Sequence, residues 1–114
     1  MSDLKRAILG IQDKKIEQVT VPEWIGIDVY VRSLNAHDGL LVSDKINDAS
    51  DPDRFAWIAA CVMCDADGVQ IFDPTDAEDI RGLSGRSVKA LITVVNAAAD
   101  LNALDASEEE AEKN

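Results

Sequence analysis

Aromatic residues are scarce in this sequence: Phe, Trp and Tyr make up 4% of the 114 residues, although 46% of the chain is hydrophobic. Much of this hydrophobic content is alanine and small aliphatic residues, which suit close packing between helices. A chain of this length buries roughly two thirds of its unfolded surface, so a single core is sufficient. We therefore expect one small, mainly helical domain.

Long apolar runs and an excess of basic residues are also missing. No stretch approaches the roughly 20 apolar residues of a membrane-spanning helix, and residues 1 to 5 (MSDLK) do not start a signal peptide. The chain has 11 Lys and Arg against 22 Asp and Glu, and its formal charge of -11 repels nucleic-acid phosphates and anionic lipids. We expect no nucleic-acid partner, no membrane partner and a cytoplasmic location.

Cysteine and histidine are too few to indicate a redox or metal site. Cys61 and Cys64 form a C-x-x-C pattern, but a redox motif places its first sulfur at a helix N-terminus, where the dipole lowers the thiol pKa. These two residues instead end an apolar run. A structural zinc site needs four ligands, and the only other soft ligand is His37. We expect two buried thiols, with no metal and no cofactor.

Other catalytic patterns fail on their spacing. Asp65-Ala66-Asp67-Gly68 begins like a calcium loop, but Gln70 stands where such a loop needs Gly, so a turn is expected. Residues 82 to 87 lack the spacing of a phosphate-binding loop, and the acids of residues 73 to 79 lie where acids stabilise a helix start. The sequence therefore predicts no enzyme activity.

The first half of the chain combines helical and strand patterns. A short amphipathic helix is expected over residues 3 to 12, followed by two strands, residues 16 to 21 and 27 to 32, around a Pro/Gly turn. These strands predict a β-hairpin. Asn35 is expected to cap a helix that reaches Ile46.

The second half is expected to be mostly helical. Asp51-Pro52 predicts a cap and first helical position for residues 53 to 63, and a short strand is expected over residues 69 to 72. A helix follows from residue 73 to residue 82, and Ser84 is expected to cap the longest helix, which ends near Leu104. The predicted fold class is thus α+β, mainly α: an N-terminal β-hairpin followed by a small helical domain.

The C-terminus differs in composition from the rest. Residues 105 to 114 carry five acids, one base and no large apolar residue, so this segment cannot offset its ordering entropy alone. We expect one domain over residues 1 to 104 and an acidic flexible tail over residues 105 to 114.

The order of several short segments resembles the tail assembly chaperones of long-tailed, siphovirus-type bacteriophages. The resemblance extends from about residue 15 to residue 105, and it is carried by the succession of segments. They are residues 21 to 24 (VPEW), 29 to 34 (VYVRSL), an alanine-rich helix, 65 to 72 (DADGVQIF), an acidic turn, 79 to 84 (DIRGLS), 86 to 88 (RSV), Leu91 and 97 to 104 (AAADLNAL).

This resemblance implies a binding function without catalysis. Such a protein is made in the host bacterial cytoplasm, associates with the tape measure protein, and helps recruit major tail protein as the tail tube polymerises, without joining the finished virion. The resemblance also implies self-association and, in many such phages, a longer frameshifted product that contacts the tail tube subunit.

A chaperone for long apolar helices needs apolar grooves on a highly soluble body, and the charge of -11 supplies repulsion between complexes. The apolar face of the last helix is a candidate partner surface, and so is a tryptophan beside the hairpin turn. The same helix face is also expected if those residues form only the core. The candidate residues are Trp24, Val88, Leu91, Ile92, Val95 and Leu101.

Two other functions compete with this one. A small acidic inhibitor or DNA mimic of a host nucleic-acid enzyme would need acids arrayed along its folded body, whereas the densest acidity here is in the tail. A thiol oxidoreductase that uses Cys61 and Cys64 would need a thiol that titrates well below its ordinary pKa.

Overall fold

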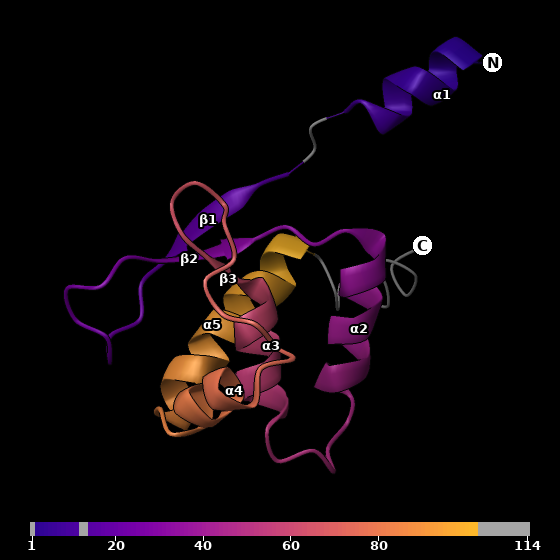
Figure 1. The fold of residues 1–114 in the computed structure, drawn as a ribbon. Coiled ribbons are helices and arrows are strands. Elements are labelled where there is room, and N and C mark those ends of the chain that lie inside the picture. The colour runs from indigo at the N-terminus through magenta and orange to yellow at the C-terminus, as the bar shows by residue number, and fades with distance from the viewer. Residues whose placement is uncertain (1, 12–13, 103–114) are drawn as a thin grey trace, which may run out of the picture.

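The computed structural model describes residues 2–11 and 14–102, which form a small sheet against a group of helices (Figure 1). The predicted fold class, α+β and mainly α with a β-hairpin before the helical part, is confirmed. The expected domain end at residue 104 and the expected acidic tail lie outside the described residues. The elements are α1 Ser2–Leu9, β1 Ile16–Val19, β2 Val29–Arg32, α2 Ala36–Ile46, α3 Arg54–Val62, β3 Met63–Cys64, α4 Ala77–Ser84 and α5 Val88–Asn102.

The predicted hairpin forms one side of a three-stranded antiparallel sheet with the order β1-β2-β3. Val31 of β2 lies opposite Glu17 of β1 and Met63 of β3. Val29 and Val31 are buried while Tyr30 and Arg32 are half-buried, which is the alternation expected of a strand with one face on a core. Because β3 follows α3 without a loop, the sheet is joined directly to the central helix.

Helix α3 occupies the centre of the helical group and packs against α2, α4 and α5 (Figure 1). This position explains its composition, since residues 58 to 62 are all buried and alanines on α3 and α5 allow the helix axes to approach closely. The core is therefore filled by aliphatic side chains, in agreement with the scarcity of aromatic residues. The largest fully buried side chains are Ile58, Val31, Val42, Val62 and Val94.

The helix caps agree only in part with the sequence. Asn35 caps α2 as predicted, because its side chain accepts a hydrogen bond of 2.7 Å from the Asp38 N–H. The prediction that Asp51 caps α3 is wrong: the helix starts at Arg54. The Asp51 carboxylate instead accepts from the Asp53 N–H and from Lys45 Nζ, so it closes a turn before the helix.

Two further predictions in the second half are wrong. Residues 69 to 72 form no strand: Gln70 makes a single β-bridge with Cys64. Val69 and Ile71 are exposed, so their side chains do not pack on the core and do not hold the segment against the sheet. Ser84 ends α4 and donates to Asp53 rather than capping the long helix. Ser87 caps α5 instead, because its Oγ accepts a hydrogen bond from the Ala90 N–H in the first turn of the helix.

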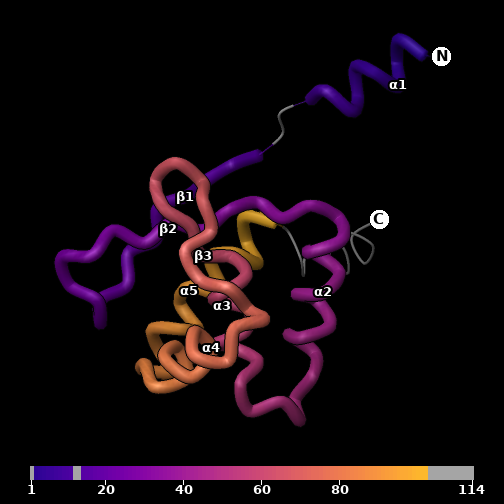
Figure 2. The backbone as a smooth tube through the Cα atoms, in the orientation of Figure 1, coloured from indigo at the N-terminus to yellow at the C-terminus, as the bar shows by residue number. Residues whose placement is uncertain are grey.

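Helix α1 lies apart from the other elements in both views of the backbone (Figures 1 and 2). None of its residues is buried. Within the described residues, no helix has the length and apolar character needed to cross a bilayer.

Candidate partner-binding surfaces

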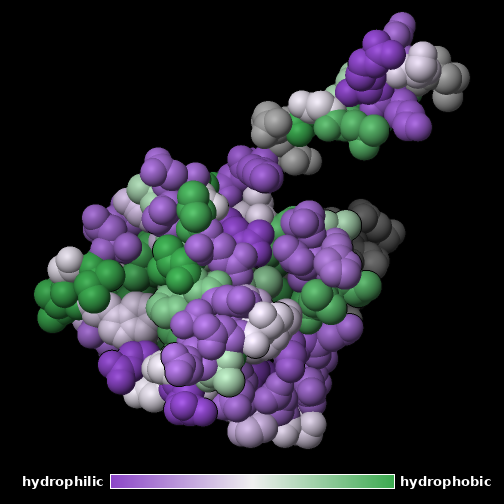
Figure 3. Space-filling view, in the orientation of Figure 1, coloured by the Kyte–Doolittle hydropathy of each residue, from purple (hydrophilic) through white to green (hydrophobic). Residues whose placement is uncertain are grey.

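The most exposed apolar helix face belongs to α1. Leu4 and Ile8 are one helical turn apart, and each is more than half exposed, at 59% and 57%. Leu9, at the end of the helix, and Ile11, two residues beyond it, are also exposed. Figure 3 shows hydrophobic surface along one side of α1 and mostly hydrophilic surface on the other. We call Leu4, Ile8, Leu9 and Ile11 the α1 apolar face.

The physical properties of α1 suit a helix that binds a partner. An isolated helix of eight residues is marginal in water, because nucleation fixes several residues for one hydrogen bond. Full burial of one Leu or Ile side chain contributes about 1.5 to 3 kcal/mol. A partner that covers the α1 apolar face would therefore stabilise both the complex and the helix.

A second apolar surface is the tip of the hairpin loop between β1 and β2. Ile25 is 90% exposed, and Ile27 is also exposed beside it. The turn requires Gly26, whose φ of 80° is unfavourable for a residue with a Cβ. Trp24 lies at the base of the loop. Its backbone N–H donates to the Val21 carbonyl, and its partly buried side chain packs on the core.

The structure places the predicted partner residues in different environments. Leu91 and Val95 are in the core, and Trp24, Ile92 and Leu101 are partly buried. Val88, at the start of α5, is exposed. The face of α5 predicted from the sequence is thus largely covered by the rest of the protein, and Val88 is its accessible member.

Sequence reasoning did not identify the two exposed apolar surfaces. The helical spacing of the apolar residues on α1 is evident in the sequence. The run of polar residues after them, residues 12 to 15, is the feature that could have indicated a helix separate from the core. Ile25 and Ile27 flank a glycine in a turn. Because turns lie on the protein surface, apolar side chains at such positions are usually exposed.

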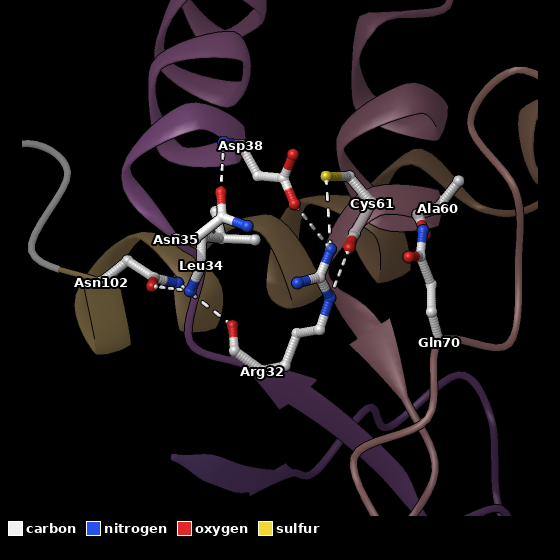
Figure 4. Close-up of polar contacts among 8 residues, drawn as sticks. All are labelled: Arg32, Leu34, Asn35, Asp38, Ala60, Cys61, Gln70 and Asn102. Carbon is white, nitrogen blue, oxygen red and sulfur yellow. Dashed lines mark hydrogen bonds and ion pairs between the residues drawn. The ribbon is translucent and has the colours of Figure 1, made fainter. Parts of the chain in front are cut away.

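A network of polar contacts joins the end of β2 to three helices (Figure 4). Arg32 Nε donates to the Cys61 carbonyl on α3 at 3.0 Å, and Arg32 Nη2 lies 3.5 Å from the Asp38 carboxylate on α2. Asn102 at the end of α5 accepts from the Leu34 N–H at 2.6 Å and donates to the Arg32 carbonyl at 3.2 Å. These contacts fix the sheet relative to α2, α3 and α5.

An open pocket of about 490 Å³ lies beside Arg32. Three acidic residues, Asp38, Asp73 and Asp79, also line it, and Asp38 is the one paired with the Arg32 guanidinium. The Asp73 carboxylate accepts from the Thr75 hydroxyl and N–H, and these hydrogen bonds lower the pKa of Asp73. The pocket is therefore acidic and unsuited to an anionic ligand.

A second groove, of about 550 Å³, is lined mainly by residues 14 to 16 and 32 to 36. Lys14, Lys15 and Arg32 line it together with one acid, Asp67. The Lys15 N–H donates to Ser33 Oγ at 2.8 Å, which ties the lysine backbone to the end of β2. We call this the basic groove.

Both cysteines are buried, and the metal patterns considered above do not assemble. In residues 2–11 and 14–102, no three His, Cys, Asp or Glu side chains come close enough to hold a metal ion. Asp65 Oδ1 accepts from the N–H groups of Asp67 and Val69 and so closes the turn, with Gly68 at a φ of 85°. His37 is exposed on the first turn of α2.

Burial raises the pKa of the Cys61 thiol above its ordinary value, although nearby Arg32 opposes the shift, and burial also raises the pKa of Cys64. The thiolate is the reactive form, so a raised pKa and burial of the sulfur both slow alkylation. We therefore expect iodoacetamide at pH 8 to alkylate both thiols more slowly in the folded protein than in the urea-unfolded chain. Alkylation that is faster in the folded state would instead support a thiol oxidoreductase.

The arrangement of the elements matches a known structure. It is similar to the tail assembly chaperone of bacteriophage HK97, with a TM-score of 0.60 and 18% sequence identity; the match covers 89% of this chain and 95% of that one. No family model matches the sequence, and a search of curated proteins finds no match. At this identity the likeness shows a common fold, and the resemblance seen in the sequence is confirmed at that level.

Proposed function

We propose that this chain, which has the fold of a phage tail assembly chaperone, works as one: it binds the tape measure protein in the host cytoplasm and keeps it soluble. It helps recruit major tail protein to the growing tail tube and does not join the finished virion. The observation that carries the proposal is the fold likeness, which covers nearly all of both chains.

The surface of the protein supports a role in binding apolar helices. The α1 apolar face is exposed and has the spacing of residues by which one helix packs on another. The hairpin tip adds Ile25 and Ile27 on a separate part of the molecule. We propose that the tape measure protein covers the α1 apolar face first, because Leu4, Ile8 and Leu9 are exposed together on one helix.

The charge of the chain supports the same role. With a formal charge of -11, copies of this protein and its complexes repel one another. This repulsion opposes aggregation through apolar surfaces that are exposed before a client covers them. We also propose that the chain self-associates through apolar surface left open, and that contact with major tail protein is made through a longer frameshifted form.

Co-expression with the tape measure protein of the same phage genome tests the proposal. We expect the tape measure protein to be soluble, and to co-elute with this chain in size-exclusion chromatography, only when this chain is present. An unrelated acidic protein of similar size serves as the control for charge alone. If the tape measure protein stays insoluble in both cases, the chaperone function is wrong, and inhibition of a host nucleic-acid enzyme becomes the function to test.

A further inference from the structure

The basic groove stands out on a chain with twice as many acids as bases, 22 against 11. Lys14, Lys15 and Arg32 line it together with one acid, Asp67. The Arg32 guanidinium is paired with the Asp38 carboxylate, so the positive charge of the groove comes from the two lysines. Residues 33 to 36 and Gly68, in the turn after β3, also line it. The turn packs closely on β1, since a Cβ on Gly68 would come within 3.1 Å of Ile16 Cδ1.

The last described residue of α5 is attached to a wall of this groove. Asn102 Oδ1 accepts from the N–H of Leu34, a residue that lines the groove, and Asn102 Nδ2 donates to the carbonyl of Arg32, another lining residue. Figure 4 shows Asn102 reaching from α5 to these two residues. The chain therefore leaves α5 beside the basic groove.

The sequence that follows has the complementary charge. Residues 105 to 114 contain Asp105, Glu108, Glu109, Glu110 and Glu112 against one base, Lys113. Asp105 is three residues beyond Asn102, a distance that an extended chain spans in about 10 Å. The glutamates are six to ten residues beyond it, so reach does not limit contact with Lys14 and Lys15.

We propose that the acidic C-terminal segment, residues 105 to 114, binds in the basic groove of its own chain through Lys14 and Lys15. Exposed ion pairs are individually weak. A short tether, however, holds the segment at an effective concentration in the millimolar range, which makes weak contacts sufficient for substantial occupancy. While the segment occupies the groove, acidic segments of other proteins are excluded from it.

NMR of the full-length chain at low salt tests this proposal. We expect the amide signals of Lys15, Ser33, Asn35 and Gly68 to differ between the wild type and the variant Glu108→Gln/Glu109→Gln/Glu110→Gln. At 1 M salt, where the Debye length is about 3 Å, the difference should disappear. Signals from Ile58 and Val62 in the core report on the fold and should not move.

A second pair of variants separates binding in the groove from a general effect of charge. In the background Lys14→Gln/Lys15→Gln, neutralising the three glutamates should no longer shift the groove signals. In the matched background Arg86→Gln/Lys89→Gln, which removes two positive charges outside the groove, the shifts should remain. Groove signals that are the same in the wild type and the triple variant overturn the proposal.

Shifts that fade on dilution also overturn it, because they identify the tail of a second copy as the occupant. The chaperone function is independent of this result, since the measurement uses the isolated chain without a tape measure protein.

Discussion

The double substitution Leu4→Gln/Ile8→Gln is expected to abolish recovery of soluble tape measure protein in the co-expression experiment. If both side chains are buried by the client, their loss costs about 3 to 6 kcal/mol, which corresponds to binding at least about 100-fold weaker. Gln is as good a helix former as Leu, so α1 itself keeps its propensity. The stability of the remaining domain should change by less than about 0.5 kcal/mol, because neither residue is buried in the free protein.

The matched control is Arg6→Gln, which puts the same residue on the polar side of α1 and should leave client recovery close to that of the wild type. Soluble client is measured by size-exclusion chromatography, and stability by urea unfolding. If the double variant recovers as much client as the wild type, the α1 apolar face is not the client site. The next variant to make is then Ile25→Gln/Ile27→Gln at the hairpin tip.

The substitution Ile58→Ala is expected to have the largest effect on stability. Ile58 is fully buried in α3, the helix that contacts α2, α4 and α5, so the cavity left by the truncation cannot be filled by movement of one neighbour alone. Replacing a buried Ile by Ala costs about 2 to 5 kcal/mol. For a small domain with a total stability of about 5 to 15 kcal/mol, this is a large fraction.

Two further variants make the test quantitative. Ile58→Val should cost about 0.5 to 1.5 kcal/mol, and Leu40→Ala, on the exposed side of α2, should cost clearly less than Ile58→Ala. The measurement is the free energy of unfolding from urea titration followed by circular dichroism. A loss at Ile58 no greater than that at Leu40 would contradict the central position of α3 in the core.

The elements that sequence reasoning predicted well are those with a strong local signal. The alternation from Val29 to Arg32 and the two strands around a turn gave the hairpin, because a strand half-buried on a core repeats every two residues. The side chain of Asn35 forms the cap that its position before an apolar helix predicted. Fold class followed from these elements together with the scarcity of aromatic residues.

The predictions that failed depended on tertiary contacts. Asp51 has the residue type and position of a cap, but a lysine on α2 competes for its carboxylate, and the side-chain hydrogen bond with Lys45 lowers the pKa of Asp51. Ser84 and Ser87 are both plausible caps for α5, and only the packing of α4, which brings Ser84 to Asp53, decides between them.

The candidate site was harder to predict than the fold. Both α1 and α5 have an apolar face in the sequence, and a helical pattern does not show which face the protein covers itself. The structure covers the α5 face at Leu91 and Val95 and leaves the α1 face open. The basic groove was not predictable from any one segment, because residues 14, 15, 32 and 67 are brought together by the hairpin and the turn after β3.

The separation of α1 from the core affects how such a protein can diversify. A substitution at Ile58 or Val31 is constrained by the packing of several elements, whereas a substitution on α1 changes no buried contact. If the client binds the α1 apolar face, as we propose, partner choice and folding depend on different parts of the chain. On that proposal, a helix with another apolar pattern in place of residues 2–9 is expected to change the client and to leave the packing of the core unchanged.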